Sequence, residues 1–142
     1  MPAPLRVLVV ANRTADSDEL LAALLDLHAR RAISVTMLAP ASWEVSDPHG
    51  GRESARRRLR TAAQRLRGSG VEIECVIGDA DPIVAVGTIW KPERFDEVMV
   101  STLPEHVSRW LRLDLPRRVR RLTARPVRHV VAQERTPVAT KT

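Results

Sequence analysis

The segment Leu5–Thr14 reads LRVLVVANRT and decides the architecture that we expect of this chain. Its first seven residues form a nearly continuous apolar run, which is typical of a strand buried on both faces within a parallel sheet. The polar residues Asn12–Thr14 then supply a turn. Leucines recur at helical spacing after this turn, and Asp16 with Glu19 resembles a capping box, so we expect a helix over Ala15–Arg31.

The rest of the chain alternates in the same way between short apolar runs and amphipathic segments. We expect four further strands, over Ile33–Ala39, Val71–Ile77, Phe95–Val100 and Val127–Ala132. We expect further helices over Arg52–Arg67, after the cap at Asp81–Pro82, and over Pro116–Thr123, with Leu115, Val119 and Leu122 facing inward. Parallel strands need crossover connections, which are usually helical and are right-handed. The sequence therefore predicts an α/β fold: a doubly wound, five-stranded parallel sheet with helices on both faces, in three α/β/α layers.

The length of 142 residues and the 44% hydrophobic content suit one domain with one core. We place this domain at residues 1–132 and expect residues 133–142, which are polar and contain a proline, to form a flexible tail. No apolar run is long enough to span a bilayer, and the first residues lack the pattern of a secretion signal. The single cysteine, Cys75, cannot form an intramolecular disulfide. These features favour a cytoplasmic protein without a membrane partner.

The net charge of +6 and the isoelectric point near 11.1 favour anionic partners. Nearly all of the excess is arginine, because Lys91 and Lys141 are the only lysines. The arginine-rich segment Arg52–Arg67 leaves nucleic-acid binding as one alternative function. However, aromatic residues make up only 3% of the chain and tyrosine is absent, so there is little for bases to stack on. No recognised nucleic-acid module is visible either, and we therefore rank this alternative last.

Ligands of doubly wound sheets bind beyond the carboxyl ends of the strands, where the strand order switches. This rule selects turn and loop residues as candidate ligand-binding groups: Asn12, Asp79, Ser101, Thr102, Arg109 and Arg112. The two hydroxyls and the start of the next helix could hold an anion in a field made positive by the arginines. In the ordinary alternative the arginines are a solvated surface and the hydroxyls belong to a turn. Asp114 would then cap the helix that begins at Pro116.

The sequence contains no pattern of a catalytic or metal centre. The four histidines, at positions 28, 49, 106 and 129, lack metal-ligand spacing. Neither a nucleophile elbow nor a phosphate-binding P-loop is present. Asp79 and Asp81 could suggest an acid pair, but a turn residue and a helix cap explain them better. We expect no catalytic residue and no metal, and at most weak nucleotide hydrolysis.

Four stretches together resemble the universal stress protein family, over about Leu5–Ala132. They are the opening VLVVANRT, the Gly78–Asp79 turn that runs into a helix, EVMVSTLP, and the closing ARPVRHVV after a basic helix. The resemblance implies a UspA-like, Rossmann-like domain of the stress response, related to adenine nucleotide alpha hydrolases. It also implies a homodimer through the last strand, with Val127, His129 and Val131 on one side. An exposed apolar edge strand would otherwise be prone to pairing.

ATP-binding members of that family carry a GxxG(x9)G[ST] loop after the fourth strand, in which glycines let backbone amides approach the phosphates. The corresponding positions hold Ser101, Pro104, Asp114 and Leu115, or Leu113 at the third glycine if the helix is shifted by one residue. None is glycine, Pro104 has no N–H to donate, and the aspartate that contacts the nucleotide is replaced by Asn12. We therefore expect no cofactor, neither ATP nor AMP, to be held by the usual motif.

Two classes of function follow from this altered motif. The first is a non-catalytic regulatory or interaction module. The second is a binding protein for a small anionic ligand, a nucleotide or a phosphate compound, at the carboxyl ends of the first and fourth strands. Trp110, with Leu111 and Leu113, would either fill the room that a nucleotide takes or pack as an ordinary loop on the sheet.

Overall fold

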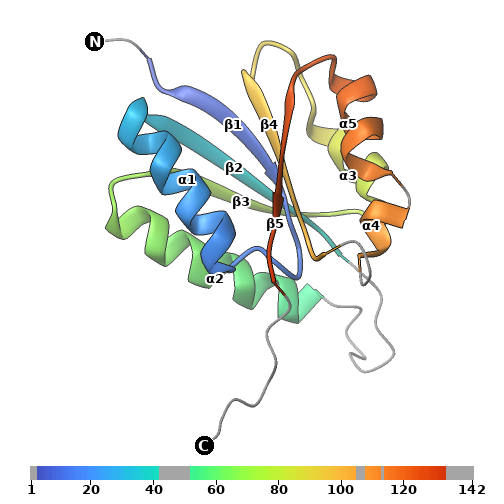
Figure 1. Ribbon diagram of the computed structural model, residues 1–142, viewed down its shortest axis with the longest axis horizontal. Helices are drawn as coiled ribbons and strands as arrows, with labels where there is room; N and C mark the ends of the chain where they lie inside the picture. Colours follow the sequence, from blue (N-terminus) through green and yellow to red (C-terminus); the bar gives the residue numbers. More distant parts are fainter. Residues whose placement is uncertain (1–2, 42–51, 105–107, 113, 134–142) are drawn as a thin grey trace, which may run out of the picture.

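The computed structural model describes residues 3–41, 52–104, 108–112 and 114–133. Helices cover both faces of a central parallel sheet, with α1 and α2 on one side and α3 and α5 on the other (Figure 1). In chain order the elements are β1 (Leu5–Val10), α1 (Asp18–Arg30), β2 (Ile33–Pro40), α2 (Arg52–Gly68), β3 (Glu72–Gly78), α3 (Pro82–Ile89), β4 (Glu97–Thr102), α4 (Arg109–Arg112), α5 (Leu115–Thr123) and β5 (Val127–Val131).

The strand order is β3-β2-β1-β4-β5, and every neighbouring pair is parallel. The chain first winds outward from β1 through β2 to β3, then returns to the other side of β1 with β4 and β5. This confirms the doubly wound sheet expected from the sequence. The strand order therefore switches between β1 and β4, and the residues after these two strands face the crevice where such folds bind ligands.

The apolar run of β1 is continuous because each of its two faces lies under a helical layer. Val7 and Val9 belong to the core shared with α1 and α2, whereas Leu8 and Val10 belong to the core shared with α3 and α5. All four are at most 1% exposed. Alternate side chains of a strand point to opposite faces, so a strand buried on both sides needs apolar residues at every position.

Two local expectations require correction, and one short helix was not expected. The N-cap of α1 is Ser17, whose Oγ accepts from the amide of Leu20, and not Asp16. In α5 the third inward position is occupied by Thr123, while Leu122 is 42% exposed. The sequence also gave no sign of α4, a four-residue helix. Such a short helix has too few residues to display a hydrophobic period.

The helix α3 lies close to the end of β3 because Gly78 has no side chain. A Cβ at this position would lie 2.9 Å from both the Cβ of Ala85 and Cδ1 of Leu38. As predicted, Asp81 caps α3, and its Oδ1 accepts from the amides of Ile83 and Val84. Within the described residues, no helix is long and apolar enough to cross a membrane.

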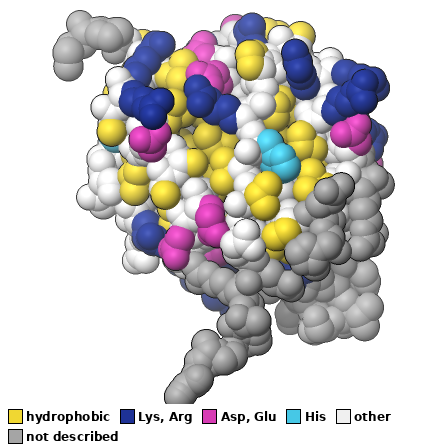
Figure 2. Space-filling model, in the orientation of Figure 1, with side chains coloured by type: hydrophobic (Ala, Val, Ile, Leu, Met, Phe, Trp, Pro, Cys, Tyr) yellow, Lys and Arg dark blue, Asp and Glu magenta, His cyan; other side chains and the backbone are white. Residues whose placement is uncertain are grey.

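The last strand, β5, forms one end of the sheet and leaves apolar surface uncovered. Hydrophobic side chains gather over β5 in the space-filling view (Figure 2). Val131 is 41% exposed, and Val127 and Val130 are partly buried. The opposite end of the sheet is β3, which among the described strands pairs with β2 alone.

Candidate functional site

The residues that follow β1 and the end of β4 contact one another directly. The hydroxyl oxygens of Thr14 and Ser101 are 2.6 Å apart, and both residues are buried. The Asn12 side chain is also buried: its Nδ2 donates to the carbonyl of Pro40 at 2.6 Å, and its Oδ1 accepts from Nη1 of Arg58 at 2.9 Å. The structure therefore brings Asn12 and Ser101 to the switch point, as the sequence predicts, but each makes contacts within the protein.

Thr102 is likewise engaged within the protein. Its Oγ1 donates to the carbonyl of Leu103 and lies 2.8 Å from Nε2 of His129 on β5. A hydroxyl has one proton, so Nε2–H of His129 is the donor in the second contact. Burial lowers the pKa of His129, because desolvation disfavours its charged form. This contact could not be predicted from the sequence, because it depends on β5 pairing beside β4.

A small cavity of about 200 Å³ opens beside these hydrogen bonds, and we call it the switch cavity. It is lined by residues from the β1–α1 turn, α2 and the segments after β4 and β5: Arg13, Thr14, Asp16, Ser17, Arg58, Leu103, Ala132 and Gln133. Among the residues that the structure describes, two guanidinium groups and one carboxylate line it. Among its other acidic neighbours, Asp18 pairs with Arg65 at 3.1 Å and Glu19 accepts from the amide of Gln133.

Arg58 is the member of the switch cavity that the sequence analysis missed. It lies on α2, and its partner Asn12 is 46 residues away in the chain. One signal could have singled it out. The buried stripe of α2 includes Ala55, Leu59 and Ala62, and position 58 is three or four residues from two of them. It therefore lies on the flank of the helix that faces the sheet, unlike most arginines of α2.

Other candidate residues are not gathered at this point. Asp79 is exposed after β3, and its Oδ1 accepts from the amide of Asp81 in a turn. Since β2 and β1 separate β3 from β4, Asp79 is roughly 14 Å from the end of β4. Arg109 and Arg112 belong to α4, but their side chains lie outside what the structure describes. Trp110 of the same helix packs against the core under α3 and α5, and Leu113 is outside the described residues.

The described positions that correspond to the family's glycine loop do not share one backbone conformation. Ser101 is part of β4, and Leu115 is a buried residue at the start of α5. Asp114 has a left-handed backbone, with φ 56° and ψ 43°, which is a conformation that favours glycine. It precedes α5 as predicted, but its side chain makes no capping hydrogen bond. The expected side-chain cap is thus wrong, because the left-handed backbone differs from the extended one of a capping residue.

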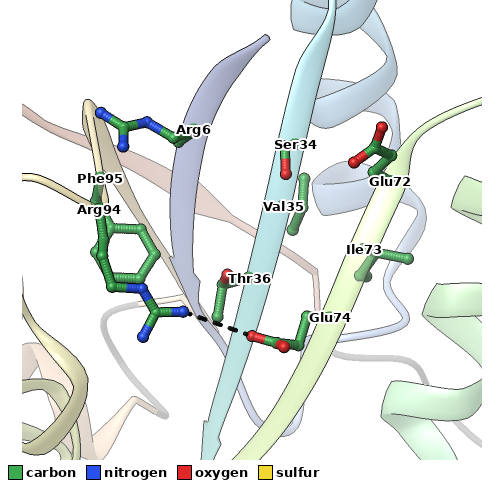
Figure 3. Close-up of a pocket in the computed structure, with 9 residues that line it drawn as sticks. All are labelled: Arg6, Ser34, Val35, Thr36, Glu72, Ile73, Glu74, Arg94 and Phe95. Atoms are coloured by element: carbon green, nitrogen blue, oxygen red, sulfur yellow. Dashed lines mark ion pairs between the residues drawn. The ribbon is translucent and has the colours of Figure 1, made fainter. Parts of the chain in front are cut away.

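A second hollow, of about 370 Å³, lies over the amino-terminal halves of β2 and β3 on the face that carries α3 (Figure 3). Ser34 and Thr36 come from β2, and Glu72 and Glu74 come from β3. Arg94 reaches across from the segment before β4, and its Nη2 lies 3.9 Å from Oε1 of Glu74. This hollow is polar and open, since α3 has only 8 residues and covers the other end of these strands.

Arg6, at the edge of this second hollow, is already paired. It donates through Nη2 and Nε to the two carboxylate oxygens of Asp96, at 3.0 and 3.2 Å. Hydrogen bonds from Arg6 lower the pKa of Asp96. Within the described ranges, no group of three or more His, Cys, Asp and Glu side chains is placed to hold a metal ion.

The strand order, the two helical layers and the crevice between β1 and β4 form a doubly wound fold that is similar to that of solved universal stress proteins. The universal stress protein from Archaeoglobus fulgidus matches with a TM-score of 0.62 at 13% identity, over 89% of this chain and 93% of its own. A structure of the universal stress protein from Archaeoglobus fulgidus in complex with dAMP gives 0.61 at 14%, over 92% and 99%. The hypothetical protein MJ0577, whose biochemical function was assigned from its structure, gives 0.60 at 15%, over 92% and 96%.

No protein-family profile matches the sequence, and no curated protein does so either. At 13–15% identity the structural likeness establishes the fold alone. The chemistry of the site depends on this chain's own residues. The likeness agrees with the resemblance noted in the sequence.

Proposed function

We propose that this chain is a non-catalytic regulatory or interaction module of the universal-stress-protein type, which does not hold ATP by the family's glycine-dependent grip. One observation carries the proposal: the polar side chains at the switch point are bonded to the protein itself. Asn12 is held by Pro40 and Arg58, Ser101 by Thr14, and Thr102 by Leu103 and His129. A ligand at this point would have to displace these contacts.

The residues at the former glycine positions support the same proposal. Phosphate loops work by presenting bare amides to the anion. Pro104 has no amide hydrogen, and the carboxylate of Asp114 would repel a phosphate. A phosphate at these two positions would therefore not find the backbone loop that the family's ATP-binding members use.

A second candidate function is the binding of a small anion in the switch cavity. Its support is the placement of Arg13 and Arg58 around one hollow at the switch in strand order. Its volume of about 200 Å³ is smaller than that of typical drug-sized ligand pockets, which begin at roughly 300 Å³. We therefore propose a compact phosphate compound or a mononucleotide fragment as the occupant. A structural neighbour was solved with dAMP, a monophosphate.

A thermal-shift titration with ATP, AMP, cyclic dinucleotides and inorganic phosphate tests both candidates. A ligand that binds the folded state raises the melting temperature with its concentration. We expect no stabilisation by ATP, and no phosphate release from ATP in a parallel assay. If the switch cavity is an anion site, phosphate or AMP should stabilise the wild type but not the Arg13→Ser variant.

Arg57→Ser is the matched control, because Arg57 is an exposed arginine of α2 outside the switch cavity. It should respond to every ligand as the wild type does. A crystal structure with a triphosphate seated over the turn after β4 would refute the main proposal. Equal ligand responses of Arg13→Ser and Arg57→Ser would refute only the second candidate.

A further inference from the structure

The outer edge of β3 has backbone groups that the sheet does not use. Alternate residues of a strand direct their amide and carbonyl groups to opposite neighbours. The carbonyl of Gly78 accepts from the amide of Ala41, which continues β2, so the even-numbered residues of β3 face β2. The odd-numbered residues therefore face outward. Of these, the carbonyl of Ile73 accepts from Nη2 of Arg67 at 3.1 Å. Within the described residues, no backbone hydrogen bond engages the outer groups of Cys75 and Ile77.

A groove of about 460 Å³ runs beside this edge, between β3 and α2, and we call it the arginine groove. Its floor is apolar and comes from both elements: Leu59, Ala63, Cys75 and Ile77. Its rim is basic and comes from α2 alone: Arg52, Arg56, Arg60 and Arg67, with Gln64 among them. An apolar floor beside an open strand edge suits a peptide strand, since its backbone can pair while the methylene groups of its long side chains pack on the floor.

The spacing of the rim arginines matches that of a strand. Arg52, Arg56 and Arg60 follow one another at intervals of four residues on α2, which corresponds to a rise of about 6 Å. Alternate side chains of an extended peptide repeat at about 6.6 Å. Carboxylates at alternate positions of an added strand would thus meet successive guanidinium groups along the groove.

Within the part of the chain that the structure describes, these arginines have few acidic partners. Arg56 pairs with Glu53 at 3.3 Å, and both side chains are more than half exposed. Within the described residues, no ion pair involves the side chains of Arg52 or Arg60. Exposed pairs such as Arg56–Glu53 contribute little to stability, so an incoming carboxylate can replace them at small cost.

The other face of the same edge has the opposite charge. The side chains of Glu72 and Glu74 lie on the face that carries α3, where Nη2 of Arg94 lies 3.9 Å from Oε1 of Glu74 (Figure 3). A strand added at β3 would therefore meet arginines on one face and glutamates on the other. Because side chains alternate between faces, this arrangement selects a sequence in which acidic residues alternate with hydroxyl or basic ones.

We propose that the β3 edge and the arginine groove bind an extended acidic segment of a partner protein, which adds to the sheet beside β3. Carboxylates at alternate positions pair with Arg52, Arg56 and Arg60, and the intervening side chains lie over Glu72 and Glu74. The proposal gives the interaction module of the first candidate function a partner class, and it does not depend on what the switch cavity binds, because the two surfaces are lined by different residues. A nucleic acid could use the arginines but neither the strand edge nor the glutamates.

The test is fluorescence anisotropy of the full chain with a labelled ten-residue synthetic peptide that alternates Glu and Thr. We expect saturable binding that weakens about tenfold in the Arg56→Gln/Arg60→Gln double variant. The Arg57→Gln variant is the matched control, because Arg57 lies on α2 outside the groove, and it should bind as the wild type does. Circular dichroism checks that the variants remain folded.

Two further probes separate strand addition from simple charge attraction. A peptide of the same sequence with N-methylated amides at alternate residues keeps the carboxylates but cannot pair along an edge, and it should bind at least tenfold more weakly. Equal binding of the methylated peptide would overturn the proposal. So would binding of a single-stranded DNA oligonucleotide through the same arginines, with a steep salt dependence and no binding of the peptide.

Discussion

At the scale of single residues, two left-handed positions frame α5. Asp114 precedes the helix with φ 56°, and Ala124 ends it with φ 55°. The amide of Ala124 donates to the carbonyl of Arg120, as in a left-handed helix cap. Alanine is the less suited of the two, because side chains without a local hydrogen-bonding group rarely adopt this conformation.

We therefore expect Ala124→Gly to increase the free energy of unfolding by about 1 kcal/mol, and Asp114→Gly by less. Urea unfolding monitored by circular dichroism measures both. Ala22→Gly is the control of opposite sign: Ala22 is exposed inside α1, where glycine should cost about 1 kcal/mol. A loss of stability in Ala124→Gly would mean that the end of α5 does not adopt this conformation in solution.

The burial of His129 beside Thr102 predicts how the free energy of unfolding responds to pH. Burial lowers the pKa of His129 in the folded state, so the unfolded chain binds the proton more tightly. The stability that uncharged His129 contributes is therefore fully present above its unfolded-state pKa of about 6.5. It is lost as the pH falls through the lower pKa that His129 has in the folded state. In His129→Gln, the free energy of unfolding should vary less between about pH 7 and pH 5.

Urea titrations at several pH values measure this difference. Identical slopes for His129→Gln and the wild type would show that this imidazole does not contribute.

At the scale of elements, the packing of α3 on the sheet depends on Gly78. A methyl group there would lie 2.9 Å from atoms of Ala85 and Leu38, which is too close for either to remain in place. Gly87, in the same short helix, has nothing within 4 Å of its own added Cβ. Gly78 and Gly87 can therefore be compared directly, because they belong to the same strand–helix unit and differ in the room for a side chain.

We expect Gly78→Ala to lower the free energy of unfolding by about 1–3 kcal/mol through overpacking. Gly87→Ala should raise it by about 0.5–1 kcal/mol, because alanine favours the helix. Thermal and urea unfolding of the two variants measure the difference. Equal effects of both substitutions would contradict the close approach of α3 to β3.

Most of these elements could be predicted because the sequence carries their signals locally. The buried run of β1 has no polar residue to interrupt it after Arg6, and the Asp81–Pro82 pair marks the start of α3. The site was less predictable. Asn12 and Ser101 could be placed by the strand-end rule, but their partners Arg58 and Thr14 are long-range contacts. Such contacts follow from tertiary packing, which a single sequence does not show.

At the scale of the whole molecule, the sheet ends in two different edges. The β5 edge exposes apolar side chains beside Arg128 and His129: Val131 is 41% exposed and Leu122 of the neighbouring α5 is 42% exposed. An apolar edge favours pairing with an identical strand. We therefore propose that the chain forms a homodimer through β5, with Val127, His129 and Val131 on one side of the strand.

Sedimentation at micromolar concentration should show a dimer, and Val131→Lys should shift it toward monomer. Lysine is a residue that natural edge strands use against pairing. Val84→Lys is the control, because Val84 is 48% exposed on α3, away from the β5 edge. A monomeric wild type, or equal effects of the two lysines, would contradict this interface.

The only thiol of the chain belongs to the apolar floor of the arginine groove. Burial raises the pKa of Cys75, and its Sγ lies 3.7 Å from the carbonyl of Leu59, so alkylating reagents should react with it slowly. A strand laid over the groove would shield this sulfur further. The rate at which the native cysteine is labelled should therefore report whether a strand occupies the arginine groove, and no engineered probe is needed.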